Sequence, residues 1–221
     1  MNLPDAIFPQ AWNWLGYGLF LPLLVHTIRH APWRRLRDPA QLNIWLGAVV
    51  CVLLLWQINA EIRPGLSFHL LGATILTLML GPRLALAALA LVIAAASLWG
   101  IGGWHSFGMN GLTMAALPVA VSYAVYRLIE THLPNNFFVY IFLTSFVGAG
   151  AAVSAVGAAT TTLLASAGVY PSGQLFDLYL PYYLLLAWSE ALLTGMAMTL
   201  LVVYKPDWVG TFDDRRYLHG R

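Results

Sequence analysis

Hydrophobic and polar positions along this chain fall into long blocks rather than into the short periods of soluble helices or strands. Seven apolar runs are separated by polar turns, and they lie at residues 11–28, 42–60, 69–80, 84–100, 109–128, 137–165 and 181–204. A helix needs roughly 20 apolar residues to cross the hydrocarbon core of a bilayer. The pattern therefore predicts an all-α integral membrane protein with about seven transmembrane helices.

Two of these runs have internal features that refine the prediction. The third run is short and ends at Gly81 and Pro82, and proline both lacks an amide proton and disfavours helical geometry in the residue before it. We therefore expect residues 69–100 to form two segments. The sixth run contains the small-residue stretch GAGAAVSAVGAATTT, which predicts that neighbouring helix backbones approach closely there.

Composition agrees with a membrane protein. The chain is 60% hydrophobic and 9% charged, with a mean hydropathy of +0.73, whereas a soluble domain carries about 25% charged residues. A net charge of +2 without a basic, aromatic-rich tract gives no reason to expect nucleic-acid binding. The single cysteine, Cys51, excludes disulfides and cysteine zinc sites, and its apolar surroundings predict a buried thiol. The N-terminus lacks signal-peptide features, so we expect the mature chain to begin at Met1.

The distribution of basic residues predicts the topology. With seven spans, ten of the eleven basic residues fall on one side, and only Arg63 falls on the other. Cytoplasmic loops carry the excess of Lys and Arg, so the N-terminus is predicted outside and the C-terminus in the cytoplasm. We expect one transmembrane domain over residues 1–204, with residues 1–10 folding onto the outer face, and a cytoplasmic tail at 205–221.

This topology places several polar groups on the outer face. They are the α-amine of Met1, Asn2, Asp5, His69, and the loop GGWHSFGMN with His105 and Asn110. Amine, amide and imidazole nitrogens suit nickel, cobalt, copper or zinc. Each group also has a plain structural explanation: His69 and His105 as interfacial side chains, and Asp5 as a cap. No HExxH or CxxC spacing supports a metal site locally.

Glu190 lies inside the last apolar run. An ionisable group within a span is a functional candidate by default. A proton relay would need a second intramembrane acid, and the spans contain none. We therefore interpret Glu190 as a structural residue that holds helices together through hydrogen bonds.

Four segments, in order along the chain, resemble one known family. They are MNLPDAIFP, FHLLGATILTLMLGPRLALAALALVI, GIGGWHSFGMNGLTM, and EALLTG followed by YKPD. They are similar to the N-terminal motif, the histidine and Leu-Gly-Pro segment, the glycine-asparagine loop and the last helix of the substrate-binding (S) membrane subunits of energy-coupling factor cobalt and nickel transporters. The chain is identified as a divergent member.

The resemblance implies a site as well as a fold. In that family the chain end folds in from outside, and a divalent transition metal, the transported substrate, is held by the terminal amine, residue 2 and a histidine near the third span. This correspondence gives Met1, Asn2 and His69. Asn110, with Gly103, Gly108 and Asp5, would order the loop that holds the N-terminal segment. No organic cofactor is expected.

The chain departs from the family at position 2, where the family has histidine and this chain has Asn2. Three explanations are open. His105 supplies the missing imidazole, so that Met1, His69 and His105 coordinate the metal. Alternatively, the site takes another metal, such as zinc or copper, through Asn2, Asp5 and two histidines, or metal binding has been lost. Ligand imidazoles must be neutral, so uptake is expected to weaken as the pH falls through roughly 6.5.

The chain contains no phosphate-binding loop, so it cannot hydrolyse ATP itself. The resemblance implies a non-enzymatic permease subunit of an ABC-type transporter in the bacterial cytoplasmic (inner) membrane, with separate ATPase subunits, a coupling membrane subunit and the lipid bilayer as partners. Two alternatives stay open. One is a membrane assembly or interaction subunit without metal transport, and the other is a metal-dependent intramembrane enzyme that would use Asp5, Glu61 or Asp177.

Overall fold

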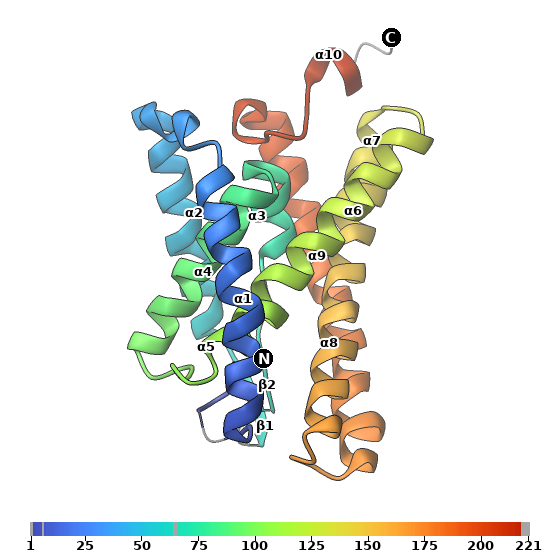
Figure 1. The fold of residues 1–221 in the computed structure, drawn as a ribbon. Helices are drawn as coiled ribbons and strands as arrows, with labels where there is room; N and C mark the ends of the chain where they lie inside the picture. The colour runs from blue at the N-terminus through green and yellow to red at the C-terminus, as the bar shows by residue number, and fades with distance from the viewer. Residues whose placement is uncertain (1, 6, 64–65, 218–221) are drawn as a thin grey trace.

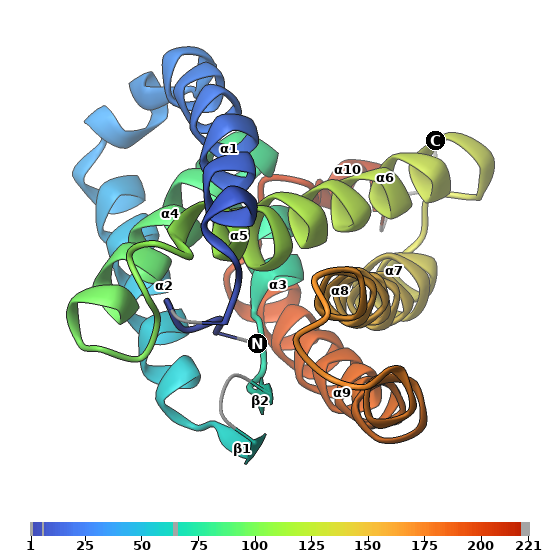
Figure 2. The ribbon, with the colours of Figure 1, turned by 60° about the horizontal axis from the view of Figure 1, so that its bottom comes forward.

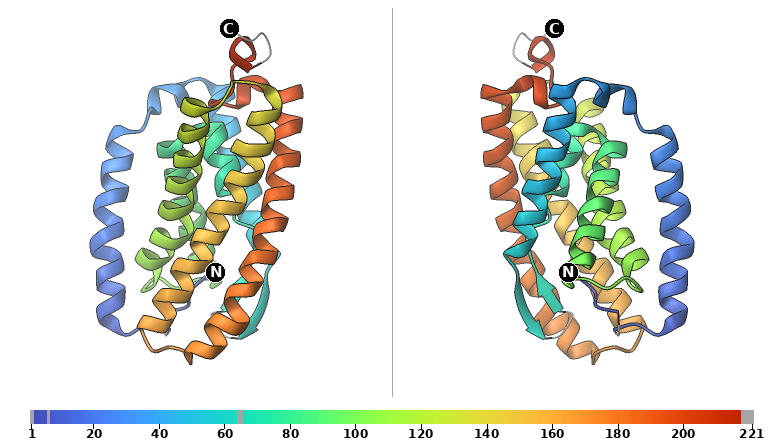
Figure 3. Two further views of the ribbon diagram at one scale, coloured as in Figure 1. Left: turned by 90° about the vertical axis from the view of Figure 1, so that its right-hand side faces the viewer. Right: turned by 90° about the vertical axis from the view of Figure 1, so that its left-hand side faces the viewer.

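The computed structural model describes residues 2–5, 7–63 and 66–217. Its helices run back and forth between two ends of an elongated bundle (Figures 1 and 3). The principal helices are α1 (Gln10–His30), α2 (Pro39–Gln57), α3 (Ala73–Leu80), α4 (Pro82–Leu98), α5 (Phe107–Asn110), α6 (Leu117–His132), α7 (Phe137–Val139), α8 (Gly148–Ser166) and α9 (Leu180–Tyr204). Three π-helical segments extend them: η2 (Gly111–Ala116), η3 (Tyr140–Val147) and η4 (Gln174–Tyr179). Shorter elements are η1 (Trp33–Arg37), β1 (Ala60–Arg63), β2 (Leu66–Phe68), η5 (Pro206–Trp208) and α10 (Asp214–Tyr217).

Each of the seven apolar runs contains a helix. Among the described residues, four helices are both long and apolar enough to cross a membrane: Pro39–Gln57, Phe107–His132, Phe137–Ser166 and Gln174–Tyr204. In contrast, α4 has 17 residues and α3 has eight. The expectation of a largely helical membrane protein is confirmed. The number of seven crossings stays a prediction.

Local sequence explains where several helices begin and end. Asp38 caps α2 by accepting a hydrogen bond from the amide of Ala40 at 3.1 Å, and Pro39 takes the first helical position, where a missing amide proton costs nothing. The predicted break in residues 69–100 is confirmed at Gly81, whose φ of +80° suits glycine and separates α3 from α4.

The small residues of the sixth run pack as predicted. A Cβ atom at Gly157 on α8 would overlap the ring of Tyr183 on α9. Two turns away on α8, Gly150 faces Ala187 and Ala191. The two helices therefore lie side by side, as Figures 1 and 2 show.

Two features were not predicted from the sequence. One is the antiparallel pair β1 and β2 at one end of the bundle, which leads directly into His69. The other is the packing of residues after α9, which return to α3: the amides of Gly210 and Thr211 donate to the carbonyl oxygens of Met79 and Leu78. The segment expected as a tail thus lies against the bundle over residues 209–212.

Candidate functional site

The N-terminal segment is fastened to the loop and helix that follow α4. Asn110 on α5 bonds twice to the backbone of Leu3: its Oδ1 accepts from the amide at 2.9 Å, and its Nδ2 donates to the carbonyl oxygen at 3.1 Å. Both residues are buried. Because each polar group of Leu3 is satisfied by the same side chain, Asn110 fixes the direction in which the segment runs.

Ser106 forms a second attachment. Its amide donates to Asp5 Oδ1 at 3.1 Å, and its hydroxyl donates to the carbonyl oxygen of Pro4 at 2.9 Å. Partial burial alone would raise the pKa of Asp5, but hydrogen bonds from Ser106 and His105 outweigh it and lower the pKa below its ordinary value. Gly103 makes the approach possible, because a Cβ atom there would overlap Asp5.

These contacts bring the chain end into the bundle rather than along its surface. Figure 2 looks onto this end and shows the N-terminal segment (dark blue) passing inward from α1 beside α5. Asn2 is 7% exposed and Leu3 is fully buried. Met1, the expected source of the terminal amine, lies outside the described residues.

His69 is buried, with 2% of its surface exposed, and follows β2 directly. Its Nδ1 donates to the carbonyl oxygen of Leu70 at 3.1 Å, which fixes the tautomer and leaves a lone pair on Nε2. Within the described ranges, Nε2 has no hydrogen-bond partner. Burial lowers the pKa of His69 to about 3. A neutral imidazole with a free, buried Nε2 is the form that binds a transition metal.

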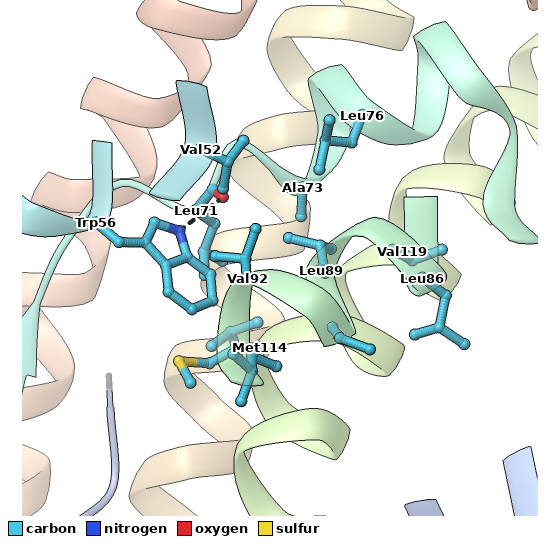
Figure 4. Packing of buried hydrophobic residues seen from close by; sticks show 14 of the residues in the cluster. Val52, Trp56, Leu71, Ala73, Leu76, Leu86, Leu89, Val92, Met114 and Val119 are labelled. Carbon is cyan, nitrogen blue, oxygen red and sulfur yellow. Dashed lines mark hydrogen bonds between the residues drawn. The ribbon is translucent and has the colours of Figure 1, made fainter. Parts of the chain in front are cut away.

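The backbone after His69 is held by two distant side chains. Trp56 on α2 donates from Nε1 to the carbonyl oxygen of Leu71 at 3.1 Å, as Figure 4 shows, and its ring lies 4.6 Å from that of His69. Glu190 on α9, 1% exposed, accepts from the amides of Leu71 and Gly72, each at 2.7 Å. The sequence singled out Glu190 but gave no sign of its partners.

His105 has a different environment. Its side chain is 77% exposed, and its Nδ1 lies 3.3 Å from Asp5 Oδ2. Over the ranges that the structure describes, no three His, Cys, Asp or Glu side chains gather closely enough to hold a metal ion. The structure thus brings His105 to Asp5 and Asn110 to Leu3, and it does not unite His69, His105 and Asp5 in one cluster.

Gly108 was expected to order the loop, and the structure places it in α5 against α1. A Cβ atom there would overlap the backbone of Gly16 and Tyr17. Gly16 in turn faces Met109. The two helices therefore pack backbone to backbone, and this contact sets the position of Asn110, two residues further along α5.

A hollow of about 820 Å³ opens between α2, α3 and α9, but its lining is almost entirely apolar. None of the described residues that line it carries a carboxylate or an imidazole that would hold a cation. The hollow borders the segment after His69 at Gly72. Cys51 lines it and is exposed, so the prediction of a buried thiol was wrong. The apolar surroundings that suggested burial are the lining of this open hollow.

Comparison with known proteins identifies the family. Residues 2–208 match the family described as the cobalt uptake substrate-specific transmembrane region. The chain belongs to this family. The match covers the N-terminal segment, the His69 segment and the loop with Asn110, so the resemblance found in the four sequence segments is confirmed.

Relatives and solved structures agree with this family. A metal transport protein of Haloquadratum walsbyi is 28% identical over 96% of this chain and 94% of its own length. A fused nickel transport protein, LarMN, of Lactiplantibacillus plantarum is 40% identical over 34% of this chain and 23% of its own. A truncated transition metal transporter has the same fold, with a TM-score of 0.81 and 21% identity over 92% of this chain and 99% of that one.

The chain is therefore a membrane protein of this cobalt uptake family, and the relatives that it resembles are named as metal or nickel transport proteins. The chain spans about a quarter of the length of LarMN and 43% of a fused nickel transport protein, NikMN, of Archaeoglobus fulgidus.

Sequence reasoning missed Trp56 and Ser106 at the site. Ser106 lies inside the GGWHSFGMN loop but has no recognised role there, Trp56 stands in no motif, and the backbone groups that they contact carry no sequence signal.

Proposed function

We propose that this chain is the substrate-binding membrane subunit of an energy-coupling factor transporter for a divalent transition metal, cobalt or nickel. The observation that carries the proposal is His69, a buried neutral imidazole whose Nε2 is free. Nitrogen donors of this kind suit these ions. Met1, through its amine, and Asn2 complete the site, as the family resemblance implies.

His105 acts on this site through Asp5 rather than as a ligand. Its exposed imidazole and its contact with the Asp5 carboxylate support this role. Asp5, Gly103 and Asn110 hold the N-terminal segment in the bundle.

The charge distribution supports an orientation with the N-terminus outside. The end of the bundle that carries the C-terminal segment (Figure 1) also carries the described basic residues Arg29, Arg34, Arg35, Arg37, Arg83, Arg127, Lys205 and Arg215. Arg63 lies on β1 at the opposite end. By the positive-inside rule the basic end faces the cytoplasm, where ATPase and coupling subunits in the bacterial inner membrane would meet the chain.

The test is metal content and affinity of the purified chain with an untagged N-terminus, in wild type, His69→Gln and His105→Ala. We expect metal affinity in His69→Gln to fall by more than the roughly 10–100-fold that is typical when a residue that only orients a ligand is changed. In His105→Ala the metal affinity should fall less than in His69→Gln. Equal binding by His69→Gln and wild type would refute the site.

A second function, an assembly or interaction subunit without transport, is favoured by Asn2. A carboxamide is a poorer ligand for cobalt or nickel than imidazole. If the untagged wild-type chain binds neither ion but copurifies with a stable membrane complex that lacks an ATPase, this second function replaces the first.

A further inference from the structure

The four residues from His69 to Gly72 form no helix or strand, yet their backbone is tightly held. The amides of Leu71 and Gly72 both donate to Glu190, one to each carboxylate oxygen. A side chain on α9 thus fixes two consecutive amides almost 120 positions earlier in the chain.

Two carbonyl oxygens of the segment are satisfied from other directions. Trp56 on α2 donates to the carbonyl oxygen of Leu71, and the carbonyl oxygen of Gly72 accepts from Leu76 in the first turn of α3. Gly72 adopts a φ of +67°, which glycine reaches without strain. In this segment, as the structure describes it, His69 Nε2 is the side-chain atom left without a partner.

We propose that Glu190 is a positioning residue that sets the direction of His69 Nε2 and thereby the affinity of the site for the metal ion. The inference rests on the proposed function, because His69 must be a ligand for its direction to matter. Both carboxylate oxygens are used on this one segment. No basic side chain in the described part of the chain forms an ion pair with Glu190.

The experiment compares Glu190→Gln with Thr194→Val, one turn further along α9. The Thr194 hydroxyl is buried without a hydrogen-bond partner, so its removal breaks no bond in the described structure. A glutamine oxygen accepts from one amide, and its NH2 group faces the other donor. We expect Ni²⁺ and Co²⁺ affinity to fall about 10–100-fold in Glu190→Gln and to stay near wild type in Thr194→Val.

Hydrogen exchange at the amides of Leu71 and Gly72 gives a readout without metal, and it should accelerate in Glu190→Gln alone. Unchanged metal affinity in Glu190→Gln overturns the proposal, whether or not exchange accelerates. If Glu190→Gln does not fold, Glu190→Asp replaces it. Its carboxyl group is one methylene shorter and cannot reach both amides from the same backbone, so affinity should again fall, and wild-type affinity overturns the proposal.

The two proposals fail in different ways. If wild type binds neither ion, the proposed function fails, and the positioning role is then judged by the reaction of His69 with diethyl pyrocarbonate, which modifies neutral imidazole. A changed rate in Glu190→Gln, with a wild-type rate in Thr194→Val, supports the positioning role. An unchanged rate in Glu190→Gln overturns it.

Discussion

The side-chain amide of Asn110 pairs with the backbone of Leu3 as one strand of a sheet pairs with another, giving one hydrogen bond and accepting one. The contact joins residues 107 positions apart and is buried. It is the central attachment of the N-terminal segment, because the bonds made by Ser106 to Pro4 and Asp5 lie further toward the surface.

We expect Asn110→Ala to release this segment. Each buried backbone group left unpaired costs about 1–3 kcal/mol, so the amide of Leu3 should exchange faster with solvent and metal affinity should fall. Asn136→Ala is the matched control, because Asn136 caps α7 through Val139 and makes no contact with the segment in the described structure. Wild-type exchange at Leu3 in Asn110→Ala would contradict the attachment.

Asn2→His should tighten metal binding. Imidazole is a better ligand for cobalt and nickel than a carboxamide, and residue 2 is already held inside the bundle, with 7% of its surface exposed. Isothermal titration with Ni²⁺ and Co²⁺ on the untagged chain measures the change. If Asn2→His binds no more tightly than wild type, Asn2 does not face the ion.

The pH dependence of stability should reveal His69. Its pKa is about 3 in the folded chain against an ordinary value of 6.5, so over this window the unfolded state binds more protons. The contribution of His69 is therefore complete above pH 6.5 and is lost as the pH falls toward 3. Unfolding measured from pH 7 to 4 should show a steeper loss in wild type than in His69→Gln, and equal slopes would contradict the burial.

This burial changes the pH dependence that we expect for metal binding. Loss of binding through pH 6.5 applies to an exposed imidazole. Burial lowers the pKa of His69, so if His69 is a ligand we expect binding to persist in mildly acidic medium.

Gly108→Ala should weaken the packing of α5 on α1. The added methyl group would overlap the backbone of α1 at Gly16, and overpacking of this kind costs about 1–3 kcal/mol. Gly18→Ala on α1 is the control, because a Cβ atom there meets nothing within 4 Å. Glycine inside a helix costs about 0.5–1 kcal/mol relative to alanine, so this change should not lower stability. Thermal unfolding in detergent should show a lower midpoint for Gly108→Ala alone.

Hydropathy predicted the helices well because burial in lipid constrains every residue of a span. The break at Gly81 and the close packing at Gly157 could also be read from residue type, because proline and glycine have few alternatives to these roles. The role of Asn110 in holding the N-terminal segment came from the family resemblance, and its contact with Leu3 is the geometry that such a role requires.

The partners of Glu190 and His105 could not be read in the same way. Glu190 bonds to backbone amides, and backbone groups carry no signature in a sequence. His105 and His69 lie on the same predicted face, but the sequence does not say which one turns inward. The structure shows that the imidazole of His69, directly after β2, is buried inside the bundle, whereas that of His105 lies in a loop at the surface.

The return of the chain to α3 has a consequence for how this short helix ends. The carbonyl oxygens of Leu78 and Met79 belong to its last turn, which has no further helical amides to bond, and they are satisfied by Thr211 and Gly210. An eight-residue helix is in this way completed by a segment synthesised some 130 residues later. These two carbonyl oxygens gain their protein partners only once residues 210 and 211 have been made, so the end of the helix behind His69 depends on a contact that is distant in the sequence.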